Sequence, residues 1–159
     1  VGTMPIAPFR ATPALIALAA FLPVAALAAP KPFTGLTGWD HTVAVTPSAQ
    51  VPRAQETWKK SDGQLLTYLE DGGLAYDDIV AMVKKNIADN SLRPAVDKDR
   101  TCDGRRAHEV EMTFGPTVVH QVIVDDAPGV TKLTYFRTQG MQASADVTSA
   151  VATYCGGAS

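Results

Sequence analysis

The chain has 159 residues, of which 46% are hydrophobic and 19% are charged, and this balance excludes an intrinsically disordered protein. Its 14 Lys and Arg residues against 16 Asp and Glu residues give a formal net charge of −2. The charge balance also excludes a protein that binds nucleic acid through a broad basic surface, because neutralising phosphates requires clustered Lys and Arg.

The N-terminal part of the chain differs in composition from the rest. Arg10 precedes an apolar run over residues 14–29, which is interrupted by a proline and has small residues at Ala26 and Ala28. A basic start, a short apolar centre and an A-x-A end are typical of a cleavable secretory signal, and the run is shorter than the ~20 residues that span a bilayer. We therefore predict a signal peptide over residues 1–28 and a soluble exported product, periplasmic or secreted, with no transmembrane segment in the mature chain.

The chain contains two cysteines, Cys102 and Cys155. In an oxidising compartment such a pair forms a disulfide bond. A redox role is the alternative, but the C-x-x-C spacing that lowers a thiol pKa is absent. We predict a structural disulfide between Cys102 and Cys155 that ties the C-terminal segment to the middle of the chain.

Turn residues divide the first half of the mature chain. Residues 29–38 are rich in proline and glycine and predict a flexible or irregular lead-in, followed by a single α+β domain over residues 39–157. Residues 41–46 alternate like a strand. Residues 55–60 and 64–70 flank a Ser-Asp-Gly turn, which predicts a hairpin of two further strands.

Two segments carry apolar residues at the spacing of one helical face. The first covers residues 77–90 and begins with two aspartates, whose carboxylates favour the positive end of a helix. The second covers residues 144–154, with Ser144 as a candidate N-cap and two glycines after its end. We predict an amphipathic helix for each segment.

Between these helices, three segments rich in β-branched and aromatic residues are separated by turn sequences: residues 105–114, 117–125 and 131–138. They predict a three-stranded antiparallel meander. The middle segment is apolar on both faces, so we expect a central strand with both sides covered. Residues 97–104 superficially resemble a calcium-binding loop but lack its glycine and glutamate, and we interpret them as a solvated loop.

Histidines are the candidates for metal chemistry. His108 and His120 fall on neighbouring strands of a predicted hairpin, together with Glu109 and Glu111. A zinc site usually needs three or four well-spaced ligands, so a surface pair between Glu111 and His120 across the turn is the simpler interpretation. Nucleophile motifs and nucleotide-binding loops are absent from the sequence. We therefore predict no catalytic residue and no cofactor, and His108, His120 and Glu111 remain the candidate metal ligands.

Four features of the predicted order of elements carry a family resemblance: Gly38-Trp39 before the first strand, the apolar helix face of Ile79, Val80, Val83 and Ile87, Gly104 with Ala107 opening the meander, and Leu133-Thr134-Tyr135 before the last helix. Over about residues 39–155 the chain resembles the Mog1/PsbP-like superfamily, in particular the small exported bacterial proteins of its DcrB-like group. It departs from them in its disulfide candidate and in lacking the lipid-anchor cysteine of some relatives.

The resemblance implies an α/β/α sandwich in which helices cover an antiparallel sheet, and binding or accessory roles without catalysis. Cystatin-like and nuclear-transport-factor-like α+β folds are alternatives, because they also wrap a helix against an antiparallel sheet. The leading functional hypothesis is an exported soluble binding or accessory module that contacts a partner protein or a component of the cell envelope. One alternative is an exported metal-dependent or hydrolytic enzyme that uses His108 and His120 with Glu109 or Glu111, and another is a secreted inhibitor of a hydrolase.

Overall fold

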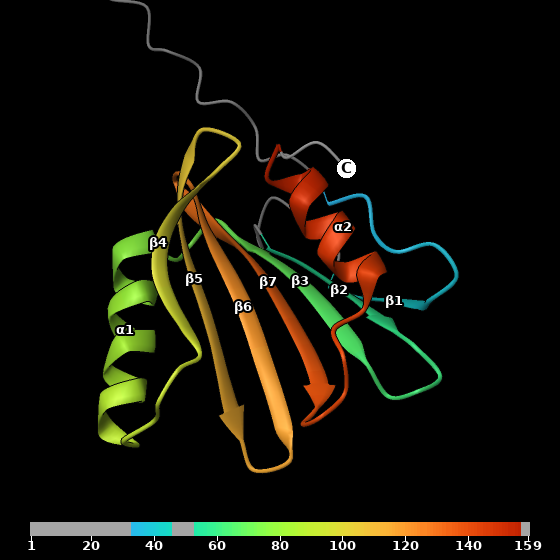
Figure 1. The fold of residues 1–159 in the computed structure, drawn as a ribbon. Coiled ribbons are helices and arrows are strands. Elements are labelled where there is room, and N and C mark those ends of the chain that lie inside the picture. Colours follow the sequence, from blue (N-terminus) through green and yellow to red (C-terminus); the bar gives the residue numbers. More distant parts are fainter. Residues whose placement is uncertain (1–32, 46–52, 157–159) are drawn as a thin grey trace, which may run out of the picture.

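A seven-stranded antiparallel sheet and two helices make up the protein in the computed structural model, which describes residues 33–45 and 53–156 (Figure 1). The strand order across the sheet is β1-β2-β3-β7-β6-β5-β4. The predicted α+β class is confirmed. The predicted signal peptide over residues 1–28 lies outside the described residues. Within the described part of the chain, neither helix has the length and apolar character needed to cross a bilayer.

The first three strands form a meander at one side of the sheet. β1 (Asp40–Val45) pairs with β2 (Arg53–Lys59), and β2 pairs with β3 (Leu65–Asp71). The hairpin predicted around the Ser-Asp-Gly turn is confirmed. Gly63 adopts a φ of 91° in that turn and donates its backbone N–H to Lys60, so the turn requires the positive φ that glycine tolerates.

The second half of the sheet contains one strand more than the sequence predicts. β5 (Arg105–Phe114), β6 (Thr117–Asp126) and β7 (Gly129–Thr138) form the predicted meander. Residues 97–104 are not the solvated loop that we predicted, because most of them belong to β4 (Val96–Cys102), which pairs with β5. β4 is an edge strand with charged side chains on both faces, and such strands lack the alternating apolar pattern.

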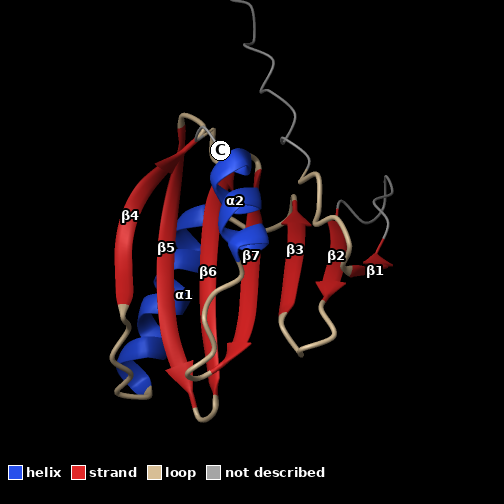
Figure 2. Ribbon diagram, turned by 45° about the vertical axis from the view of Figure 1, so that its right-hand side comes forward, coloured by secondary structure: helices blue, strands red, loops and turns tan. Residues whose placement is uncertain are grey.

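The two helices contact different side chains of the sheet. α1 (Tyr76–Asp89) packs Ile79 and Val80 against Ile123 of β6, whereas α2 (Ala145–Tyr154) packs in a separate cluster with Val122 and Val124. Successive side chains of a strand point to opposite faces. Figure 2 accordingly shows α2 in front of the sheet and α1 behind it. The predicted helices at 77–90 and 144–154 are confirmed to within one residue at each end.

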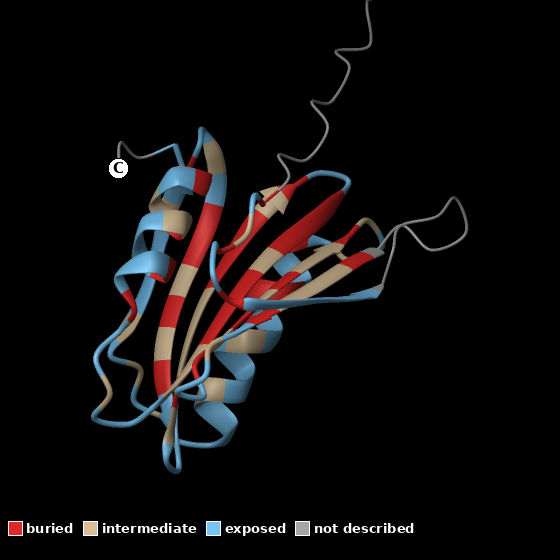
Figure 3. Ribbon diagram, turned by 90° about the vertical axis from the view of Figure 1, so that its right-hand side faces the viewer, coloured by how far each residue is buried: buried red, intermediate tan, exposed pale blue. Residues whose placement is uncertain are grey.

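An aromatic cluster joins the segment before β1 to the core. The ring of Phe33 lies 5.2 Å from that of Trp58, 5.9 Å from that of Tyr68 and 6.0 Å from that of Tyr154. Leu36 is buried in the same cluster. The backbone of residues 33–38 is irregular, as predicted, yet its apolar side chains belong to the core. In Figure 3 the buried positions lie mostly on the strands, and the outer sides of both helices are exposed.

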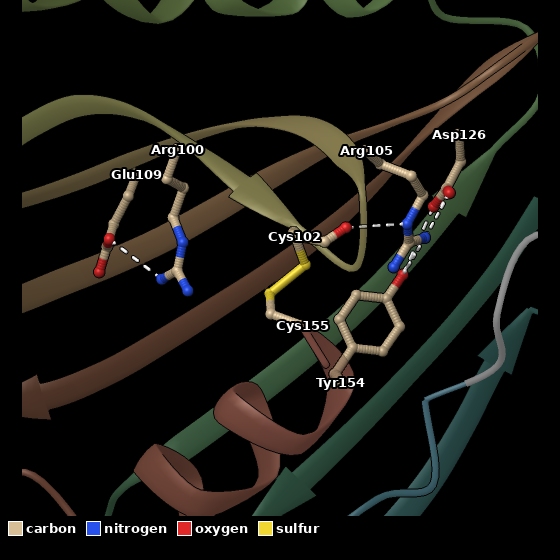
Figure 4. Close-up of a disulfide and its surroundings, with 7 residues drawn as sticks. All are labelled: Arg100, Cys102, Arg105, Glu109, Asp126, Tyr154 and Cys155. Atoms are coloured by element: carbon tan, nitrogen blue, oxygen red, sulfur yellow. Dashed lines mark hydrogen bonds and ion pairs between the residues drawn. A yellow bond between two sulfur atoms is a disulfide. The ribbon is translucent and has the colours of Figure 1, made fainter. Parts of the chain in front are cut away.

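The predicted disulfide is confirmed between Cys102, the last residue of β4, and Cys155, the residue that follows α2 (Figure 4). The backbone N–H of Asp103 also donates to the carbonyl oxygen of Cys155 at 2.9 Å. Beside the disulfide, Arg105 binds Asp126 in a buried ion pair and lies over the ring of Tyr154, with 5.0 Å between its guanidinium carbon and the ring centroid. The C-terminal end of α2 is therefore held by covalent and polar contacts together.

We predict that the variant C102A/C155S unfolds at lower urea concentration than the oxidised wild type. The two cysteines are separated by 53 positions, and closing a loop of that length destabilises the unfolded chain by up to ~4 kcal/mol. Equilibrium urea unfolding measures the difference, and wild-type protein treated with a reductant should unfold together with the variant. Identical unfolding midpoints for the oxidised protein and the variant would contradict the stabilising role.

Candidate functional site

The structure does not bring the predicted metal ligands together. His108 pairs with Ile123 across β5 and β6, and directly paired residues share a face, so His108 lies on the side of α1. His120 lies on the opposite side, where it borders a cavity along α2 together with Glu109. Among the described residues, no group of three or more His, Cys, Asp or Glu side chains is arranged to hold a metal ion.

His108 is buried between two aspartates of the edge strand. Its Nδ1 lies 2.8 Å from Asp99 Oδ1, and its Nε2 lies 3.1 Å from Asp97 Oδ1, while only 1% of its side chain is exposed. The hydrogen bond with His108 lowers the pKa of Asp99, and the charge of Lys84 on α1 adds to this shift. The Nδ1 contact with Asp99 therefore joins β5 to β4, whereas the buried Nε2 lies near Asp97 without forming a hydrogen bond.

Glu109 is contacted by three basic side chains. His120 Nε2 lies 2.8 Å from Glu109 Oε1, and Arg100 Nη1 lies 3.1 Å and Lys98 Nζ 3.5 Å from Glu109 Oε2 (Figure 4 shows the Arg100 contact). Burial raises the pKa of Glu109, but the hydrogen bond with His120 and the neighbouring positive charges outweigh burial and lower the pKa overall. A carboxylate held in this way is a poor general base, because its proton affinity is reduced.

Glu111 lies opposite His120 in the register of β5 and β6, as predicted. The predicted pair between these two side chains does not form, however. Both carboxylate oxygens of Glu111 accept hydrogen bonds from the guanidinium of Arg137 at 3.2 Å, and His120 binds Glu109 instead. The planar guanidinium matches a carboxylate with two parallel hydrogen bonds, which makes it the stronger partner. Glu111 thus joins β5 to β7, two strands away.

A groove that the sequence analysis did not predict crosses the sheet on the face that carries α1. It has a volume of about 590 Å³, and none of its described lining residues belongs to a helix. Its lining comes from β2, β3, β5, β6 and β7: Gln55, Thr67, Leu69, Phe114, Val119, Gln121, Lys132, Thr134 and Phe136. We refer to these residues as the open groove. Phe114, the last residue of β5, is 41% exposed there.

The open groove corrects one expectation for β6. Its sequence is apolar on both faces, and we predicted that both sides would be covered. Ile123 is covered by α1, but Val119 on the same face is only half-buried and lines the open groove. The helix therefore covers only one end of the strand. This apolar surface lies outside the helix contact, and sequence periodicity alone does not reveal how far a helix extends over a sheet.

A second groove lies between α1 and β4, with a volume of about 370 Å³. Its charged side chains other than Lys84 are already paired. Arg106 binds Asp125 at 2.9 Å and Asp77 at 3.2 Å, and its guanidinium carbon lies 4.7 Å from the ring centroid of Tyr76. The α2-side cavity of about 180 Å³ borders the equally paired Glu109. The open groove differs from both because none of its described lining residues is a carboxylate.

Comparisons of the chain with protein-family models, with curated proteins and with solved structures find no match. The fold and the groove together define an α+β protein with a large accessible surface on one face of its sheet. Its function therefore has to be inferred from the chemistry of its own residues.

We predict that Glu109 makes stability depend on acid pH. The pKa of Glu109 is lower in the folded state than its ordinary value of 4.5, so the stabilisation is complete above that value. As the pH falls through the lower folded-state pKa, protonation removes this stabilisation. The variant E109Q should be less stable than wild type at neutral pH, by on the order of 1 kcal/mol, and should lose less stability on acidification.

Urea unfolding at a series of pH values from neutral to acid measures this effect. E56Q is the matched control, because Glu56 also binds a histidine, His41, at 2.7 Å but at a more exposed position with 29% side-chain exposure. We expect E56Q to lose less stability than E109Q at neutral pH, because an ion pair at a more exposed position contributes less. An E109Q variant with an unchanged pH dependence would show that Glu109 is not the group responsible.

Proposed function

We propose that the chain is an exported, non-catalytic binding or accessory module that holds its ligand in the open groove. The observation that carries the proposal is the groove itself. Ligand sites are typically concave, have volumes of ~300–1,000 Å³, and combine an apolar lining with a few polar groups. The open groove has about 590 Å³, with Leu69, Val119 and two phenylalanines beside hydroxyl and amide groups. The ligand class that fits is a component of the cell envelope, and a partner protein is the alternative.

Export is supported by the disulfide and by the N-terminal sequence. The Cys102–Cys155 bond persists in oxidising compartments such as the periplasm or the extracellular space. The sequence pattern of residues 1–28 is that of a secretory signal. We place the mature protein in one of these compartments, where lipids and other envelope components are available as ligands.

We also propose that the fold is an α/β/α sandwich of the Mog1/PsbP-like type. In support, Val122 and Ile123 are neighbours on β6 and yet pack in different clusters, the first with α2 and the second with α1. A cystatin-like fold uses one helix against its sheet, and this fits less well with the two clusters. Binding and accessory roles are what the resemblance implies for such a domain.

A non-catalytic role is supported by the state of the candidate catalytic groups. His108 is buried and hydrogen-bonded to Asp99, and Glu109 is contacted by three basic side chains. Glu111 is occupied by Arg137. None of these side chains lines the open groove. We expect purified protein to show no turnover of generic ester, peptide or phosphate substrates, and turnover abolished by a single substitution would contradict the proposal.

We predict that the folded protein binds N-phenyl-1-naphthylamine, an uncharged fluorescent probe, and that V119S weakens this binding about tenfold. Replacing one aliphatic group in an apolar pocket by a polar one has an effect of about that size. V43S is the matched control, because Val43 is 52% exposed but lies on β1 outside the open groove. Fluorescence titration measures both variants.

Urea unfolding of the two variants shows whether each is folded under the conditions of the titration. We expect V43S to bind the probe as wild type does. Equal loss of binding in V119S and V43S, or no binding of the probe to folded wild type, would overturn the proposal that the open groove is the ligand site.

A further inference from the structure

The charge of the open groove identifies the class of ligand that it suits. We infer that the groove binds an amphiphile with an anionic head group, with the head at Lys132 and the apolar part toward Phe136 and Phe114. The inference rests on the proposed function, because it names the ligand of the same groove. The distribution of charge, the direction of the groove along β7 and its hydrogen-bonding groups each support it.

Lys132 is the one charged side chain among the described residues that line the open groove, and no carboxylate lines it. Its ammonium has no ion-pair partner within residues 33–45 and 53–156, whereas Arg100, Arg106 and Arg137 each bind a carboxylate. Lys132 is half-buried in the middle of the sheet. The electrostatic attraction between a cation and an anion that enters beside it is stronger in a partly apolar surrounding, because few waters screen the pair there.

The groove has its charge at one end, beside Leu69, and its two phenylalanines at the other. Lys132, Thr134 and Phe136 alternate along β7 and therefore point to the same face. Lys132 has Ile123, which α1 covers, as its neighbour on β6, whereas Phe136 has Val119 as its neighbour there. Four positions along a strand extend ~13 Å, so the backbone positions of Lys132 and Phe136 are separated by that distance. A ligand with a charged head and an apolar tail matches this arrangement.

Hydroxyl and amide groups lie between the two ends. Thr134 is paired with Thr67 on β3 and with Gln121 on β6, and the Gln121 amide donates to the Thr134 hydroxyl at 3.0 Å. The hydroxyl groups of Thr134 and Thr67 remain able to donate to an acceptor. Carboxylate, phosphate and sulfate heads all accept hydrogen bonds, and so do ester or amide links next to the head. The structure thus assigns an anionic amphiphile without distinguishing among these heads.

Other ligand classes fit the open groove less well. A neutral lipid that covered Lys132 would leave the ammonium buried without a partner, which is costly. A cationic amphiphile would add a second positive charge beside it. A polyanion such as a nucleic acid would need several clustered cations, and the described lining of this groove has one.

Three probes with the same twelve-carbon chain and different heads test the inference: dodecanoate, dodecyl maltoside and dodecyltrimethylammonium. Each is titrated below its critical micelle concentration into the full exported protein, and its affinity is read by isothermal titration calorimetry. We expect dodecanoate to bind about tenfold more tightly than the maltoside, which is the effect of one charge-assisted contact, and the trimethylammonium probe to bind weakest. Added salt should reduce the preference for dodecanoate.

The variant K132Q keeps most of the side chain and removes its charge. We expect it to lose about tenfold in dodecanoate affinity and to keep its affinity for dodecyl maltoside, while K132E should favour the trimethylammonium probe. K85Q is the matched control, because Lys85 is a 73% exposed lysine of α1 outside the groove, and it should bind all three probes as wild type does. Urea unfolding shows that each variant is folded.

The outcomes separate this inference from the proposed function. If dodecanoate and dodecyl maltoside bind equally well and K132Q changes neither, the open groove is an apolar ligand site and the preference for anions is overturned. If none of the probes binds the folded wild type, both the preference and the groove as a ligand site are overturned. If dodecanoate binds but V119S and K132Q leave its affinity unchanged, the ligand lies elsewhere and the inference fails.

Discussion

β3 and β7 lie far apart in the sequence, and their pairing joins the two meanders of the sheet. Residues 65–71 pair in an unbroken register with residues 130–136, and we call this pairing the seam. The other strands of each meander lie on the outer sides of β3 and β7. Gly129 shows how closely the chains approach there, because a Cβ atom at this position would overlap the carbonyl oxygen of Asp71. Leu66 and Leu133 are almost fully buried beside the seam. The core and the open groove both depend on this one pairing.

The two faces of the sheet at the seam are covered to different extents. On the side of α2, the aromatic cluster, the Arg105–Asp126 pair and the disulfide hold the helix against the sheet. On the side of α1, the helix covers Ile123 and Val130 and leaves the rest of β7 open. A single 14-residue helix is too narrow to cover five strands, since a helix with its side chains is ~10–12 Å across and strands are ~4.8 Å apart. The open groove is the part of the sheet that remains.

Local patterns in the sequence were sufficient for most elements. Helix periodicity, turn residues and the pair of cysteines predicted both helices, the hairpin, the meander and the disulfide. β4 was not predicted, because the charged residues of this edge strand lack the alternating apolar pattern that indicates a strand. The separation of His108 from His120 follows from register, since His120 is opposite Glu111 and His108 is an odd number of positions from Glu111. The open groove could not be predicted, because Leu69 and Lys132 become neighbours only through the long-range pairing of β3 with β7.

The most direct test of the open groove as the ligand site is a map of amide chemical shifts in isotope-labelled protein during titration with dodecanoate. If the ligand lies in the groove, the changes should concentrate on β3, β7 and β6, at residues such as Leu69, Lys132 and Val119, and should be absent from α2. Changes centred on α2 and the cavity beside Glu109 would contradict the account, as would a spectrum that does not change at all.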